Sequence, residues 1–269
     1  MSERKVKRPI IIVGAPRSGT TMLARIFAAH PEVAFWEEPR TIWEIGNSLR
    51  ENDQLDESHL TSKIGVKIDH RFSRFLVNSQ KSRFAEKTPT NVLRIRFIHA
   101  IYPDAKIIYV VRNGRASVAS ILKMRSKPAR PDRVWSRLRE TPVSGYPALI
   151  LRALRRDRFL VHPAGWKEFS SDSIEKIAQQ WDAAVRIARQ DLSALPDESW
   201  IELKYEDLIS DHQVHLKKML NFCELEDSEA FMKKADGMVD PSRSNVAVPD
   251  SVNAALERYA ISDPIECDR

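Results

Sequence analysis

The sequence predicts an α/β fold in which a parallel β-sheet is flanked by helices on both faces. Two short runs of apolar, mostly β-branched residues, 9–13 and 105–111, are typical of buried parallel strands. Each run is followed by a turn that contains glycine and then by apolar residues at helical spacing. Alternation of apolar and polar residues from 200 to 208 predicts a third strand. Strands that alternate with helices along a chain favour a parallel sheet.

The chain of 269 residues is expected to form a single domain, with a basic, proline-interrupted insertion at about 123–160. Its hydrophobic content of 42% and charged content of 30% exclude a disordered chain. The net charge of +6 favours anionic partners without selecting one. The two cysteines have no metal-ligand spacing, and no apolar run has the length of a membrane span. These features favour a soluble, cytoplasmic protein.

The first predicted strand leads into a candidate phosphate-binding loop, Gly14-x-x-x-x-Gly19-Thr20-Thr21. Backbone N–H groups at a helix N-terminus carry partial positive charge and have no intrahelical partner, so they bind anions. A P-loop that binds nucleoside triphosphates has a lysine where this chain has Thr20, and that lysine reaches the β- and γ-phosphates. Here the cation lies within the loop, as Arg17. This arrangement argues against a metal-bound triphosphate and suits a compact anion.

Residues 14–21, Gly-Ala-Pro-Arg-Ser-Gly-Thr-Thr, resemble the 5′-phosphosulfate loop of sulfotransferases that use 3′-phosphoadenosine 5′-phosphosulfate (PAPS). The loop is most similar to that of the glycan and tyrosylprotein branches. The resemblance implies a fold related to the P-loop kinases and PAPS as the co-substrate. It also implies that the backbone N–H groups of Ser18, Gly19, Thr20 and Thr21 bind the 5′-phosphate, and that Arg17 binds the sulfuryl oxygens of the co-substrate.

A second phosphate element follows the strand at 105–111. Arg112 comes directly after this strand, and Ser120 lies eight positions later, about two turns into the next predicted helix. Arginine suits bidentate phosphate binding, and a hydroxyl adds a further hydrogen bond. The pair resembles the 3′-phosphate element of the same family, although Asn-Gly replaces the more usual Asp-Pro after the arginine. The Tyr-Glu-Asp-Leu segment at 205–208 also resembles a family element, which implies that Tyr205 faces the 3′-phosphate, although a core position is equally expected. Residues 241–245 resemble a segment of tyrosylprotein sulfotransferases, which implies that Ser244 belongs to the nucleotide site.

Two further segments carry candidate catalytic residues, in addition to Arg17. A short strand at 33–36 leads to Glu37 and Glu38, and tyrosylprotein sulfotransferases have Glu-Glu-x-Arg at about this distance from the loop. The resemblance implies that Glu38 is the general base, although strand geometry leaves open which glutamate faces the site. The Glu-Lys-Thr-Pro segment at 86–89 resembles a family element whose lysine reaches the transferring group. Lys87 is therefore a candidate, while the residues alone also fit an exposed lysine.

The remaining segments indicate less chemistry. Residues 41–80 show no functional pattern; 52–62 are expected to form a surface loop or frayed helix, and 67–80 a helix. A helix is predicted from Thr90 or Asn91 to Ile101, and another from 172 to 192 with Trp181 in the core. The basic stretch 123–158 has eleven Lys and Arg against three acidic residues. An acceptor-binding lid, a membrane-surface contact, a nucleic-acid patch and a solvated insertion all fit this stretch.

The resemblance implies transfer of a sulfuryl group from PAPS to an acceptor hydroxyl, without a metal ion. A saccharide or glycolipid is the first expected acceptor, and a tyrosine in a peptide is the second. A P-loop nucleotide kinase is one alternative, but it requires a phosphate-binding cation at position 20 and an acidic Mg²⁺ site. A basic nucleic-acid-binding module centred on 123–158 is the other. Neither alternative explains both phosphate elements, so no stable nucleic-acid partner is expected. Peripheral membrane contact through the basic insertion is compatible with a sulfotransferase.

Overall fold

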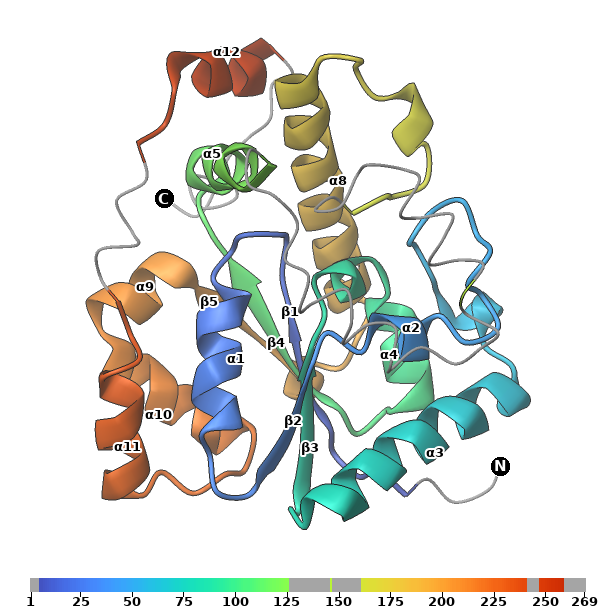
Figure 1. Ribbon diagram of the computed structural model, residues 1–269, viewed down its shortest axis with the longest axis vertical. Helices are drawn as coiled ribbons and strands as arrows, with labels where there is room; N and C mark the ends of the chain where they lie inside the picture. Colours follow the sequence, from blue (N-terminus) through green and yellow to red (C-terminus); the bar gives the residue numbers. More distant parts are fainter. Residues whose placement is uncertain (1–4, 126–145, 147–160, 241–246, 259–269) are drawn as a thin grey trace.

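The computed structural model describes residues 5–125, 146, 161–240 and 247–258, and is built on a five-stranded sheet (Figure 1). The strand order is β2-β3-β1-β4-β5, and every neighbouring pair is parallel. The strands are β1 (Ile10–Val13), β2 (Val33–Glu37), β3 (Arg83–Lys87), β4 (Lys106–Val111) and β5 (Trp200–Lys204). The expected α/β class and the two apolar strands are therefore confirmed.

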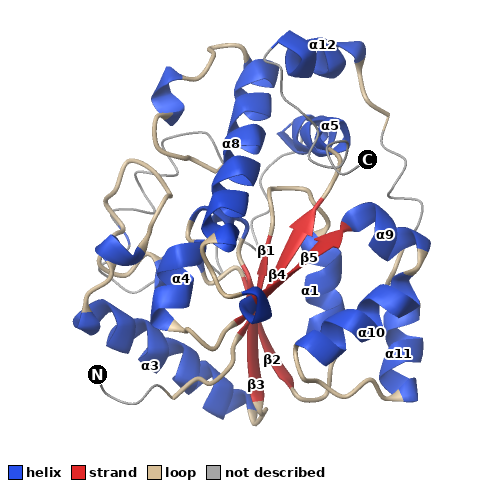
Figure 2. Cartoon of the chain, turned by 180° about the vertical axis from the view of Figure 1, so that it is seen from behind, coloured by secondary structure: helices blue, strands red, loops and turns tan. Residues whose placement is uncertain are grey.

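Helices cover both faces of the sheet, as Figure 2 shows from behind. One face packs against α1 (Thr20–Ala28), α9 (Tyr205–Ser210), α10 (His212–Phe222) and α11 (Glu229–Asp236). The other packs against α2 (Arg40–Trp43), α3 (Ser62–Ser79), α4 (Ile95–Ile101), α5 (Gly114–Arg125), α8 (Ser173–Ser193) and α12 (Asp250–Arg258). Short 3₁₀ helices lie at Glu57–His59, Pro89–Leu93, Trp166–Glu168 and Asp197–Ser199. No helix in the described ranges is long and apolar enough to cross a membrane.

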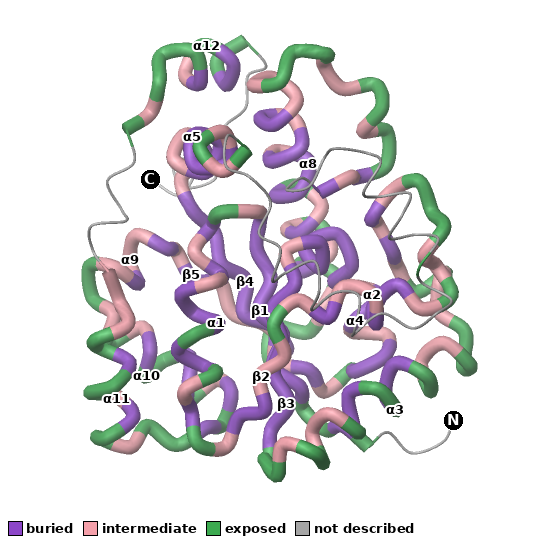
Figure 3. Tube along the Cα trace, in the orientation of Figure 1, coloured by how far each residue is buried: buried purple, intermediate pink, exposed green. Residues whose placement is uncertain are grey.

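The central strand β1 is buried on both faces, which explains its continuous apolar sequence. Ile11 and Val13 enter one hydrophobic core, whereas Ile10 and Ile12 enter the other, because successive strand residues point to opposite faces. Figure 3 shows the resulting buried layer along the sheet, with exposed residues on the outer helices. The sheet therefore provides a rigid support for the loops at its carboxyl edge.

Three element boundaries differ from the predictions. The helix expected from Thr90 is divided into a 3₁₀ helix and α4, because Arg94 leaves helical geometry with φ −140°. Helix α3 begins at Ser62, earlier than the predicted residue 67. Thr61 caps it, because its hydroxyl accepts a hydrogen bond from the N–H of Ile64. The third predicted strand ends at Lys204, and the residues after it form α9. The prediction for α8 is confirmed, and Trp181 is buried.

Candidate active site

Strand register brings the predicted site residues to one edge of the sheet. Lys87, the last residue of β3, lies opposite Ile12 of β1 and opposite Glu37 of β2. At the other side of β1, the ends of β4 and β5 are aligned by the pairing of Val111 with Lys204. All five carboxyl ends therefore meet at this edge, which is where open α/β sheets bind their ligands. The loops that follow β1, β2, β4 and β5 carry the remaining candidates.

The loop after β1 leaves the N-terminus of α1 open to an anion. Gly19 is the N-cap residue with φ 99°, and no side chain caps the helix. A Cβ atom at Gly19 would lie 2.2 Å from a ring carbon of Tyr205, so both the backbone conformation and the space require glycine. The first turn, which starts with Thr20 and Thr21, contains no acidic residue. Its backbone N–H groups therefore form a positive anion-binding end.

Among the described residues, the backbone N–H of Ser18 is already used, whereas its hydroxyl is not. Its N–H donates to the carbonyl oxygen of Ala15 at 3.1 Å, so this group is already used within the loop. Its Oγ is buried and makes no hydrogen bond to any residue that the structure describes. A buried polar atom without a partner is costly. The Ser18 hydroxyl is therefore a candidate hydrogen-bond donor to an anion at the helix N-terminus.

Arg17 joins the two predicted phosphate elements. Its Nε donates to Ser120 Oγ at 3.0 Å, and its carbonyl oxygen accepts a hydrogen bond from Arg112 Nη1 at 3.2 Å. Arg17 itself has φ 73°, a conformation that is uncommon for residues other than glycine. Backbone outliers of this kind persist only where the surroundings hold them. The first loop and the segment after β4 thus form one connected site.

Tyr205 packs against both phosphate elements. The guanidinium of Arg112 lies over its ring, with Cζ 4.3 Å from the ring centroid, and Arg112 itself is 6% exposed. The same ring fills the space beside Gly19. Tyr205 is buried, as expected for a core residue, and it also lies at the candidate nucleotide site. Ser244, the remaining candidate, lies outside the described residues.

Glu38 and Lys87 form an ion pair at the ends of β2 and β3. Lys87 is 1% exposed, which shows that the alternative of an exposed lysine is wrong. Its Nζ lies 2.8 Å from Glu38 Oε1 and 3.8 Å from Glu37 Oε1. The Glu37 side chain is 54% exposed and that of Glu38 is 25% exposed. Of the two glutamates, Glu38 therefore makes the closer contact with Lys87.

The glutamate before Lys87 is a buried acid that the sequence did not single out. Glu86 accepts hydrogen bonds from Thr88 Oγ1 at 2.7 Å and from Asn91 Nδ2 at 2.8 Å. Burial raises the pKa of Glu86 to about 7, although these hydrogen bonds oppose the shift. Glu86 thus ties the end of β3 to the following 3₁₀ helix. The sequence feature that could have indicated the buried Glu86 is its position in the Glu-Lys-Thr-Pro segment, directly before Lys87.

We expect the Glu86→Gln substitution to stabilise the protein increasingly between pH 4.5 and 7. In this range the folded chain retains a proton that the unfolded chain has lost, so the contribution of Glu86 to the free energy of unfolding falls as pH rises. Glutamine has no such titration; its amide oxygen can accept from Asn91 Nδ2, and its NH2 group can donate to the Thr88 hydroxyl. The difference should reach about 3 kcal/mol near pH 7 and then level off. Urea unfolding of both proteins from pH 4.5 to 8 tests this, and a difference independent of pH would contradict it.

A model of the sulfotransferase family matches residues 9–229. The chain belongs to the sulfotransferase family. It is 22% identical to protein-tyrosine sulfotransferase A of Caenorhabditis elegans over 80% of this chain and 50% of the relative. It is 34% identical to protein-tyrosine sulfotransferase 1 of Danio rerio over 42% of this chain and 35% of the relative. The chain thus spans half or less of the length of these curated relatives.

Solved structures confirm the fold of this family member. The sulfotransferase domain from the curacin biosynthetic pathway has a TM-score of 0.58 and 14% identity, over 97% of this chain and 100% of that domain. The sulfotransferase domain of the Synechococcus PCC 7002 olefin synthase has a TM-score of 0.53 and 17% identity, over 98% of both chains. At these identities the likeness establishes the shared α/β fold and leaves the substrate open. The expectation of a sulfotransferase-family fold is confirmed.

The sulfotransferase family match contains both phosphate elements and the Glu38–Lys87 pair, and it ends before residue 244 and α12. In the part of the chain that the structure describes, no group of three or more His, Cys, Asp or Glu residues has the arrangement to hold a metal ion. Most of the basic insertion lies outside the described residues. The expectation that residues 52–62 form a surface loop or frayed helix is wrong at two positions, because Asp53 and Leu55 are buried.

Proposed function

We propose that this sulfotransferase transfers the sulfuryl group of PAPS to an acceptor hydroxyl. The observation that carries the proposal is the direct contact of Arg17 with Ser120 and Arg112, beside the Glu38–Lys87 pair. The proposal is supported by the position of these contacts at the carboxyl edge of the sheet, where the candidate phosphate elements and the Glu38–Lys87 ion pair both lie. The residues fit a nucleotide with phosphates at both ends, because the open helix N-terminus and the buried arginine are separate sites for anions.

Each phosphate group of the nucleotide has its own set of ligands in this proposal. The backbone N–H groups of Gly19, Thr20 and Thr21 and the hydroxyl of Ser18 bind the 5′-phosphate. Arg112 and Ser120 bind the 3′-phosphate, and the Tyr205 ring holds the Arg112 guanidinium in place. Because Ser18 N–H is used by Ala15, the backbone contribution is limited to the residues after it.

Glu38 and Lys87 supply the proton and charge changes of the transfer. Glu38 accepts the proton of the acceptor hydroxyl, whose oxygen forms the new O–S bond while the bond from sulfur to the 5′-phosphate oxygen breaks. Protonation neutralises Glu38, so the ammonium of Lys87 becomes available to the sulfuryl oxygens. Arg17 and Lys87 offset the charge that develops on the leaving phosphate. The residues thus act by positioning and electrostatic stabilisation, as in phosphoryl transfer.

A tyrosine in a peptide is the acceptor that we place first, ahead of the saccharide or glycolipid that the sequence favoured. The curated relatives are protein-tyrosine sulfotransferases by name, and this supports the order. A phenol with a pKa near 10 also gives up its proton more readily to a carboxylate than a sugar hydroxyl does. The net charge of +6 is compatible with acidic residues next to the tyrosine.

The acceptor is tested by incubating the protein with PAPS and either a tyrosine peptide with acidic neighbours or a set of saccharides and glycolipids. We expect sulfotyrosine, formed in equal amount with 3′-phosphoadenosine 5′-phosphate (PAP). Sulfation of a saccharide alone would correct the acceptor and keep the reaction. Absence of sulfated product from every acceptor, with phosphoryl transfer from ATP–Mg²⁺ instead, would overturn the proposal in favour of a kinase.

A further inference from the structure

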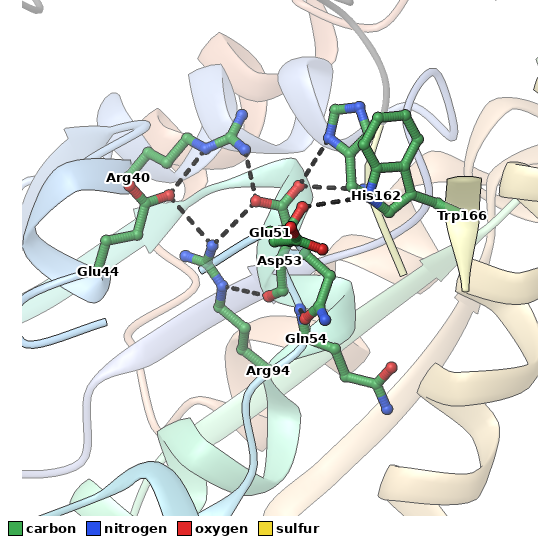
Figure 4. A network of polar contacts seen from close by, with 9 residues as sticks. Arg40, Glu44, Glu51, Asp53, Gln54, Arg94, His162 and Trp166 are labelled. Atoms are coloured by element: carbon green, nitrogen blue, oxygen red, sulfur yellow. Dashed lines mark hydrogen bonds and ion pairs between the residues drawn. The ribbon is translucent and has the colours of Figure 1, made fainter. Parts of the chain in front are cut away.

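Four charged side chains form a buried ion cluster close to Glu38, shown in Figure 4. The cluster consists of Arg40, Glu44, Asp53 and Arg94. Arg40 donates from Nε to Glu44 Oε1 at 3.0 Å and from Nη2 to Asp53 Oδ1 at 2.8 Å. Arg94 Nη2 lies 3.1 Å from the same Glu44 oxygen and 3.5 Å from the same Asp53 oxygen. Two cations and two anions thus share two carboxylate oxygens.

Burying these charged side chains carries a large desolvation cost. The side chains of Glu44, Asp53 and Arg94 are each 4% exposed or less, so their charges have lost almost all contact with water. Buried ion pairs of this kind seldom stabilise a fold more than apolar side chains of the same volume. The fixed geometry that they impose is therefore the feature to explain.

Arg40 connects the cluster directly to the backbone of Glu38. Its N–H donates to the Glu38 carbonyl oxygen at 2.7 Å, while the Glu38 N–H donates to the Lys87 carbonyl oxygen at 2.9 Å. Glu38 has φ 56°, a left-handed conformation that costs about 1–3 kcal/mol for a residue with a side chain. Such a conformation persists only where its neighbours hold it. The cluster fixes the arginine that holds Glu38 from its C-terminal side.

Asp53 is the residue on which the cluster converges. Its Oδ2 accepts a hydrogen bond from the N–H of His162 at 3.0 Å, and its own N–H donates to the His162 carbonyl oxygen at 2.7 Å. Its carbonyl oxygen accepts from Arg94 Nε at 2.8 Å. Asp53 is therefore held on several sides, and its burial prevents contact with an acceptor molecule. Among its described contacts, the bond from Arg40 connects Asp53 to the segment that carries Glu38.

We propose that Asp53 and Arg40 are positioning residues, which hold the carboxylate of Glu38 in the orientation that accepts the proton of the acceptor. The inference rests on the proposed function and extends it to residues outside the nucleotide site. A displacement of about 1 Å in a reacting group can cost on the order of a hundredfold in rate. Loss of the cluster geometry should therefore affect turnover more than binding.

The variants Arg40→Lys and Asp53→Asn test this role. Lysine keeps the charge at position 40 but cannot bridge two carboxylates with a planar fork. Asparagine keeps the shape at position 53, but it removes the charge and replaces one of the two accepting carboxylate oxygens by an NH2 group that cannot accept a hydrogen bond. We expect each variant to lower kcat at least tenfold, with the acceptor KM and the Kd for PAP within about twofold of the wild type. A retained PAP affinity also shows that the variant is folded.

A double-mutant cycle with Glu38→Gln separates positioning from direct contact. If Arg40 and Asp53 act through Glu38, they should cause no further loss of kcat once the base is absent. Arg40 is partly exposed, so a direct contact with the acceptor is the competing explanation. That contact would raise the acceptor KM and would persist in the Glu38→Gln background, and either result would overturn the inference.

Arg83→Lys is the matched control. Arg83 is also buried, and its guanidinium donates to the carbonyl oxygens of Arg8 and Cys223, but it begins β3 at the opposite end from Lys87. We expect a lower melting temperature and unchanged kcat at a temperature where all variants are folded. Equal loss of kcat in Arg83→Lys, or unchanged kcat in both cluster variants, would overturn the inference.

The proposed function and this inference fail in different ways. A wild-type protein that sulfates no acceptor would overturn the proposed function, and the positioning role with it. An active wild type with fully active cluster variants would overturn the inference alone. Amide hydrogen exchange gives a readout that does not depend on turnover. The amide hydrogen of Arg40, which is bonded to the Glu38 carbonyl oxygen, should exchange faster in Asp53→Asn than in Arg83→Lys.

Discussion

Replacement of Glu38 by glutamine is expected to lower kcat by about 10²–10⁴-fold, which is the usual contribution of a general base. Glutamine has nearly the same shape but cannot take up the acceptor proton. The affinity for PAP should stay within about twofold of the wild type, because none of the proposed nucleotide ligands is changed. Steady-state sulfation rates and calorimetric titration with PAP, both on the same preparation, measure the two effects.

Glu37→Gln is the control for this prediction. Glu37 is next in sequence and carries the same charge, but its carboxylate is more exposed and lies 3.8 Å from Lys87 Nζ. We expect its kcat to fall less than about threefold, since a surface charge at that distance is largely screened by water. Equal losses in the two variants would show that the local charge matters and that Glu38 is not the base.

Replacement of Arg112 by alanine is expected to weaken PAP binding at least about a hundredfold, because charge-assisted hydrogen bonds to a phosphate are worth roughly 1.5–3 kcal/mol each. Arg112 is buried, and its guanidinium also joins Tyr205 to the loop after β1 through Arg17. The loss should therefore include both a ligand and the alignment of the loop. Calorimetric titration with PAP gives the change in Kd.

Arg115→Ala is the matched control for Arg112→Ala. Arg115 lies three residues after Arg112, in the first turn of α5, and its Nη1 donates to Asn253 Oδ1 of α12. We expect its Kd for PAP to change less than about threefold, because the charge of Arg115 is partly exposed to water and makes no described contact with the proposed nucleotide ligands. A comparable loss in both variants would indicate a general effect of positive charge on nucleotide binding.

The fold and the candidate nucleotide site could be predicted because their signals are local in the sequence. Buried parallel strands appear as short apolar runs, and the candidate phosphate-binding residues follow those strands directly. Gly19 and Arg112 are recognisable from the turn and the strand end at which they lie. Parallel strand order then brings separate loops to one edge without any further information.

The buried ion cluster could not be predicted, because charged residues in a polar segment indicate exposure unless their partners are known. Asp53 lies between Asn52 and Gln54 in a stretch without periodicity. Its burial depends on Arg40 and Arg94, which are distant in sequence. The same reason applies to Lys87, whose burial depends on the neighbouring strand that supplies Glu38.

Calorimetric titration of the purified protein with PAP in the absence of metal, compared with ATP–Mg²⁺, tests the central claim most directly. The two connected phosphate elements predict saturable binding of PAP, which is lost in Arg112→Ala and retained in Glu38→Gln. ATP–Mg²⁺ should bind much more weakly, since Thr20 stands where a triphosphate site requires lysine. Tight binding of ATP–Mg²⁺ without binding of PAP would contradict the proposed sulfotransferase site.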